Sequence, residues 1–152
     1  MKKTFLPLAL LSLTAFPAFA VEQHHNAAAA IDKKAAAATA TGNPLLEEMF
    51  ALDSAFKEVV SGVALGDGPR VLKAIETLHG KREKTVEALH SGEVKPPKNA
   101  DKMKEFEGLD SEFHSDLETL AAAASKNDTG AMVSTTKKLL DGCVNCHKTF
   151  RE

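Results

Sequence analysis

Apolar residues recur at alternating steps of three and four along four stretches of the chain, which predicts four amphipathic helices. The expected helices cover residues 44–65, 69–90, 100–124 and 132–150. No stretch of useful length alternates with a period of two, so strands are not expected. Short connections make successive helices antiparallel, and the predicted fold is an all-α, up-down-up-down four-helix bundle.

The ends of these helices coincide with residues that start or stop helices. Asn43 is a natural N-cap, Pro44 suits the first helical position, and Gly66 can end the same helix. Pro96 and Pro97 break the chain between the second helix and the third. In the first helix the positions expected to face inward are Leu45, Met49, Leu52, Phe56, Val59, Val60 and Val63.

The first twenty residues have the pattern of a cleavable export signal. Two lysines precede the apolar run 5–19, which is too short to cross a bilayer as a helix, and cleavage is expected after Ala20. We therefore expect a mature protein in the periplasm that is not inserted in the membrane. Residues 21–42 predict an alanine-rich flexible tail, whose His24 and His25 are expected to bind metal weakly at most, and residues 43–152 predict the helical domain.

Charge and motif content exclude several functions. The chain has 19 Lys+Arg and 21 Asp+Glu, and loss of the two signal lysines would make the mature protein more acidic. Nucleic acids and anionic membranes select basic surfaces, so neither is an expected partner. No Ser/His/Asp set, paired carboxylate site or phosphate loop stands out, so we do not expect an enzyme.

The strongest chemical signal is the sequence Cys143-Val144-Asn145-Cys146-His147 near the end of the fourth helix. Two cysteines three residues apart lie one turn apart on a helix, so both thiols can meet the vinyl groups at one edge of a porphyrin. His147 follows Cys143 by four residues, which brings its imidazole to the same face as the proximal iron ligand. These residues predict one covalently attached haem c.

Other uses of the two cysteines are weaker. A structural zinc site needs four ligands, and the chain has no second cysteine pair. A thioredoxin-like dithiol would follow a strand, whereas residues 132–140 have helical spacing. A plain disulfide stays open, because an oxidising compartment favours pairing of the two thiols.

The segment from Cys143 to Arg151 resembles the haem-binding segment of the class II cytochromes c, the cytochrome c-prime family and its low-spin relatives. Phe150 and Arg151 match the aromatic and basic residues that follow the haem motif after two variable positions. The resemblance extends more loosely over residues 43–152 and implies a four-helix bundle with the motif at the end of the last helix. It also implies that Arg151 lies near the proximal imidazole and the haem edge, and that two copies can pair through their first two helices.

Only five residues follow His147, so we expect any distal ligand of the iron to come from upstream. The resemblance implies that the first helix crosses the distal face of the haem. In the family this helix carries either a methionine that binds iron or a bulky apolar residue that blocks it. Met49 lies on the inward stripe and is the expected ligand. Phe50 lies on a more exposed face, but a gap-free comparison counted back from Gly66 puts Phe50 at the usual distal position.

Further residues compete for roles around the haem. His114 and His79 are alternative axial ligands, His90 is a weaker one, and Arg82 and Lys57 are candidate partners of the propionates.

These expectations lead to three functions. With His147 and Met49 both on iron, the protein is a six-coordinate, low-spin electron carrier between redox partner proteins. If Phe50 covers an unliganded distal face, the protein is five-coordinate and binds NO or CO, as the cytochromes c-prime do. A third function is a haem-bearing sensor, or a subunit that passes electrons to a fixed enzyme partner.

Overall fold

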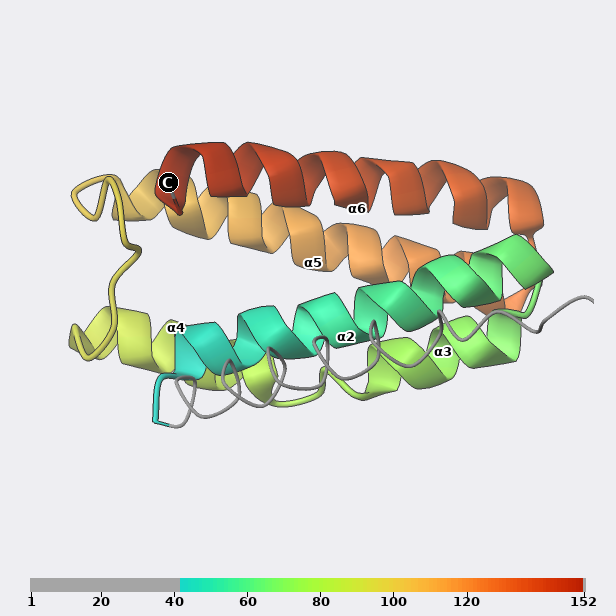
Figure 1. The fold of residues 1–152 in the computed structure, drawn as a ribbon, viewed down its shortest axis with the longest axis horizontal. Helices are drawn as coiled ribbons and strands as arrows, with labels where there is room; N and C mark the ends of the chain where they lie inside the picture. The colour runs from blue at the N-terminus through green and yellow to red at the C-terminus, as the bar shows by residue number, and fades with distance from the viewer. Residues whose placement is uncertain (1–41, 152) are drawn as a thin grey trace, which may run out of the picture. The chain divides into compact units, whose positions relative to one another are not determined.

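The computed structural model describes residues 42–151, which contain five helices and no strand (Figure 1). The helices are α2 (Pro44–Leu65), α3 (Gly68–Glu76), α4 (Lys81–Ser91), α5 (Met103–Ser125) and α6 (Thr129–Phe150). The predicted export signal, nearly all of the alanine-rich segment, and His24 and His25 lie outside the described residues. No helix within residues 42–151 has both the length and the apolar character needed to cross a membrane.

The five helices form four roughly parallel rods, in agreement with a four-helix bundle, because α3 and α4 together make one rod. Helices α5 and α6 lie side by side, and α2 packs against α3 and α4, which follow one another along a single rod (Figure 1). The prediction of one continuous helix over 69–90 is therefore wrong. Thr77 Oγ1 donates to the carbonyl of Ala74 at 2.7 Å, and Gly80 adopts φ +73°, a left-handed conformation that glycine enters without strain.

The predicted ends of α2 are confirmed. The side chain of Asn43 accepts a hydrogen bond from the backbone N–H of Leu46 at 3.1 Å, Pro44 opens the helix, and Gly66 ends it at φ +66°. Helix α5 begins later than expected, at Met103, because the chain turns at residues 100–101.

Two groups of buried side chains form the core. The aliphatic cluster consists of Ala55, Val59, Val63, Val71, Ala74, Leu78, Leu117, Leu120, Ala123, Ala124, Met132 and Leu139. The aromatic cluster consists of Leu45, Ala88, Leu89, Val94, Phe106 and Phe150. Val60 was expected to face inward but is exposed, because the buried face of α2 is centred on residues 45, 48, 55, 59, 62 and 63.

The loop between α4 and α5 holds the C-terminal end of α6. The backbone N–H of Lys98 donates to the carbonyl of Phe150 at 3.0 Å, and the side-chain amide of Asn99 donates to the carbonyl of Thr149 at 2.6 Å. Carbonyls in the last turn of a helix lack partners within the helix, so these bonds satisfy two of them. The loop therefore fixes the segment that carries the cysteine motif.

Candidate haem site

Cys143, Cys146 and His147 lie in the last turns of α6, and all three are partly buried. The two cysteines are not joined in a disulfide. Cys146 packs against the aromatic cluster, whose Phe106 and Phe150 rings meet edge to face with centroids 5.2 Å apart. The motif thus combines two thiols and an imidazole on one helix with an apolar cluster beside them.

The protonation of the thiols bears on the alternative of a redox-active dithiol. Burial raises the pKa of the Cys143 thiol. Burial also raises the pKa of Cys146, with smaller contributions from the negative charge of Asp110 and from Cys143. Reactive dithiols need a lowered pKa, because the thiolate is the nucleophile. The raised pKa values of Cys143 and Cys146 are the opposite of what a thioredoxin-like site needs.

The two candidates for the distal position differ in their surroundings. Met49 is partly buried and packs against the aromatic cluster, the same cluster that Cys146 contacts. Phe50 is 38% exposed. Within α2, therefore, the methionine faces the side of the bundle that holds the cysteine motif, and the phenylalanine faces outward.

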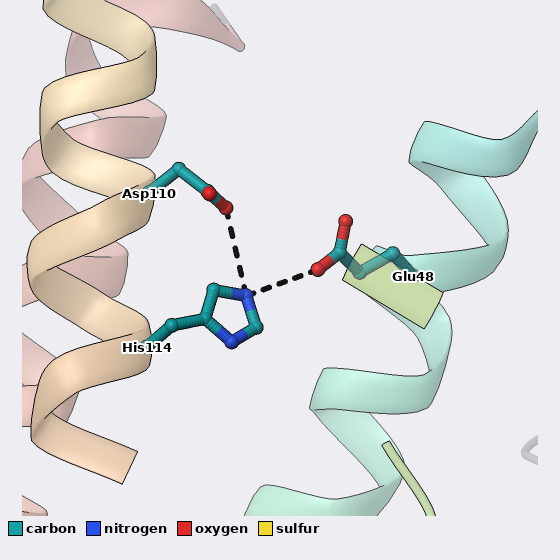
Figure 2. Close-up of side chains that lie close together, drawn as sticks. All are labelled: Glu48, Asp110 and His114. Carbon is teal, nitrogen blue, oxygen red and sulfur yellow. Dashed lines mark hydrogen bonds and ion pairs between the residues drawn. The ribbon is translucent and has the colours of Figure 1, made fainter. Parts of the chain in front are cut away.

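The other histidines occupy different positions. His114 Nε2 lies 3.1 Å from Oε1 of Glu48 and 3.5 Å from Oδ1 of Asp110 (Figure 2). His90 Nε2 lies 3.0 Å from Oε1 of Glu107, and His79 is exposed. His114 is thus already directed at two carboxylates.

The basic residues expected near the haem, Arg151, Arg82 and Lys57, make the following contacts in the structure. Arg151 is exposed, and its backbone N–H donates to the carbonyl of His147 at 3.0 Å. Arg82 Nε donates to Oδ2 of Asp110 at 2.9 Å, and Lys57 pairs with Asp53 on the surface of α2. Arg82 is thus held to α5 through Asp110, whereas the Lys57 pair lies within α2 and is exposed.

Glu48 is a buried charged residue that the apolar spacing of the first helix did not predict. Glu48 is only 1% exposed, although a glutamate at that position reads as a polar neighbour of the inward stripe. The signal that could have found its partners is the pair Asp110 and His114, four residues apart on one helix face.

The fold and the motif together define a class of protein, a helical bundle with a c-type haem attachment sequence at the end of its last helix. The family model described as Cytochrome C' matches residues 54–151, and the chain belongs to this family. Members bind one covalent haem c, and haem c is therefore the cofactor of this chain. Searches of curated proteins and of solved structures find no match.

The matched range has a consequence for the site. It includes Cys143, Cys146, His147 and Arg151 but begins after Met49 and Phe50. The residues present fit haem c, since α6 carries a thiol pair and an imidazole, and Cys146 and the thioether of Met49 pack against one apolar cluster. The family match itself does not distinguish the two distal candidates.

Proposed function

We propose that this protein is a periplasmic one-electron carrier. In this proposal Cys143 and Cys146 attach the haem, His147 is the proximal ligand and Met49 is the distal ligand. When bound, haem c supplies the redox centre. The residues of the chain bind it, exclude water from it and set its environment.

The observation that carries the proposal is the shared contact of Met49 and Cys146 with the aromatic cluster. A thioether from α2 and a thiol from α6 meet the same small group of side chains, although they are far apart in the sequence. Phe50, the residue that would cover an open distal face, is exposed instead. Met49 is therefore the distal candidate that the packing favours.

The ligand pair determines the type of function. An imidazole from His147 and a thioether from Met49 would fill both axial positions, which leaves none for an exogenous ligand. Apolar side chains around such a pair lower the local dielectric and exclude water, and both effects tune a reduction potential. The pair thus favours electron transfer over gas binding or catalysis.

The cellular setting is part of the same proposal. Family members are typically periplasmic, in agreement with the export signal predicted over residues 1–20. The partners are redox proteins, without nucleic acid or membrane insertion, and Arg151 lies at the haem edge that they approach. A homodimer is supported by Leu46, Phe50 and Val60, which are exposed on one face of α2.

An optical spectrum of the reduced protein with and without carbon monoxide tests the proposal. We expect sharp α and β bands that carbon monoxide leaves unchanged, because both axial positions are filled. Met49→Ala removes the thioether, so the variant should become high-spin and bind carbon monoxide. The neighbouring substitution Phe50→Ala is the matched control and should leave the spectrum unchanged.

The opposite pattern would support the alternative. A wild-type protein with one broad band that shifts under carbon monoxide is a five-coordinate gas-binding protein, and Met49 is then a packing residue. In that case Phe50→Ala, not Met49→Ala, should alter the rate of carbon monoxide binding.

A further inference from the structure

Three side chains that the proposed function does not use converge between α2 and α5. Glu48 comes from α2, and Asp110 and His114 come from successive turns of α5 (Figure 2). His114 Nε2 lies 3.1 Å from Oε1 of Glu48 and 3.5 Å from Oδ1 of Asp110. One ligand atom from each residue lies within 4.8 Å of the other two.

Glu48 is the unusual member of this group. Its side chain is 1% exposed, and its Oε2 has no hydrogen-bond partner among the described residues. A buried carboxylate oxygen without a partner loses its hydration and gains nothing in return. Such an atom in a native protein requires an explanation, and a bound ion or an ordered water supplies one.

The two carboxylates of the group, Glu48 and Asp110, carry more negative charge than Arg82 can balance. Arg82 donates from Nε to Oδ2 of Asp110 at 2.9 Å and from a second nitrogen to Oγ of Ser111 at 3.0 Å. The guanidinium thus balances one of the two carboxylates, and Glu48 faces only the imidazole. A divalent cation bound between Glu48 and His114 would balance the second carboxylate charge.

The separations also suit a metal ion. Two ligand atoms bound about 2.0–2.1 Å from a tetrahedral zinc ion lie about 3.3 Å apart. The distances from the imidazole nitrogen to the two carboxylate oxygens, 3.1 and 3.5 Å, lie on either side of that value. Ligands four residues apart on one helix, as Asp110 and His114 are, are a recurrent source of two zinc ligands.

We propose that Glu48, Asp110 and His114 form a binding site for a divalent transition-metal ion of the zinc type. The imidazole selects such ions over magnesium and calcium, which prefer a larger set of oxygen ligands. Arg82 holds Asp110 with its Oδ1 directed at the imidazole, the kind of supporting contact that metal ligands use. His114 and Asp110 are 16% and 18% exposed, so an ion can reach the site from solvent.

The site borders the haem site, because Asp110 pairs with Arg82, a propionate candidate, and its charge acts on Cys146. None of its three ligands belongs to the cysteine motif or is an axial ligand in the proposed function. Zinc binding and the carbon monoxide response can therefore fail independently.

Calorimetric titration of the full haem-loaded protein with Zn²⁺ tests the site. We expect one zinc ion per chain, an increase in the thermal unfolding midpoint on binding, and no competition from Mg²⁺. His114→Ala and Glu48→Gln should each weaken binding on the order of a hundredfold or more, since even loss of a supporting contact costs about 10–100-fold. Glu48→Gln preserves the shape of the side chain, so it covers the case in which His114→Ala unfolds.

His90→Ala is the matched control, because His90 also pairs with one carboxylate but lies in an exposed pair. This variant should bind zinc as the wild type does. His24 and His25 are retained in every protein compared, so any zinc that they take is common to all. Wild-type protein that binds no zinc, or equal binding by wild type, His114→Ala and Glu48→Gln, overturns the proposal.

Discussion

The two core clusters differ in composition and in how fully the side chains around them are buried. The aliphatic cluster joins α2, α3, α5 and α6 through side chains such as Val71, Leu120 and Leu139, which have no solvent exposure. The aromatic cluster lies toward the end of the bundle where α4 and the C-terminus of α6 are found, and its sulfur-containing neighbours are only partly buried (Figure 1). The molecule thus keeps its tightest packing away from the cysteine motif. Incomplete burial is what a site that binds a cofactor requires of its surroundings.

The largest expected effect comes from the aliphatic cluster. Leu139→Ala should lower the free energy of unfolding by about 2–5 kcal/mol, because Leu139 is fully buried and its neighbours cannot close the cavity completely. Urea unfolding followed by circular dichroism measures the loss. The haem absorption spectrum of the folded variant should stay as in the wild type, since the cluster that contacts the motif is intact.

The next residue provides the control. Leu140 is 51% exposed, although it is the same residue type as the buried Leu139 beside it. Leu140→Ala should change the free energy of unfolding by less than about 0.5 kcal/mol. Equal destabilisation by the two substitutions would contradict the separation between the aliphatic core and the outer face of α6.

A smaller effect is expected in the aromatic cluster, from the Phe106–Phe150 ring pair. Edge-to-face rings contribute about 0.5–1.5 kcal/mol beyond the area that they bury. A double-mutant cycle with Phe106→Leu and Phe150→Leu should therefore give a coupling energy in that range. Both single variants should also shift the haem bands, in contrast to Leu139→Ala, because Met49 and Cys146 pack against the same cluster.

Additive single effects would show that the rings merely fill space. Shifted haem bands in Leu139→Ala and unshifted bands in the ring variants would reverse the roles given to the two clusters.

The sequence predicts those features whose causes are local. Asn43, Pro44 and Gly66 act within one helical turn of themselves, and the bounds of α2 follow from them. The break before Gly80 is harder to predict, because the apolar spacing continues across it and only the backbone conformation reveals it. The buried side of α2 is offset from the predicted stripe, which exposes Val60.

Glu48 illustrates what no local pattern contains. Its partner His114 is 66 residues away in the sequence, and the pairing exists only once α2 and α5 lie together. The residue at the distal position of the haem likewise depends on contacts between helices that are far apart in the sequence. The spacing of apolar residues did not decide whether Met49 or Phe50 occupies the distal position. In the structure Met49 packs against side chains of α4, α5 and α6, whereas Phe50 is exposed.

The smallest expected effect concerns charge at the contact between α5 and α6. Lys138 Nζ lies 2.9 Å from Oδ1 of Asp116 and 3.3 Å from Oε1 of Glu112. Hydrogen bonds to Asp116 and then to Glu112 raise the pKa of Lys138 above its ordinary value of 10.5. A raised pKa in the folded state means that the ion pairs stabilise the protein at pH below 10.5 and cease to do so as the pH rises through the raised pKa.

Lys138→Met should therefore reduce the urea midpoint slightly at neutral pH, and less in high salt, because exposed ion pairs are screened. The difference from wild type should vanish in alkaline solution above the raised pKa. Lys137→Met, at the neighbouring exposed position, is the control. A loss as large as that of Leu139→Ala, or one that salt and alkali leave unchanged, would mean that charge, and not burial in the aliphatic cluster, holds α5 against α6.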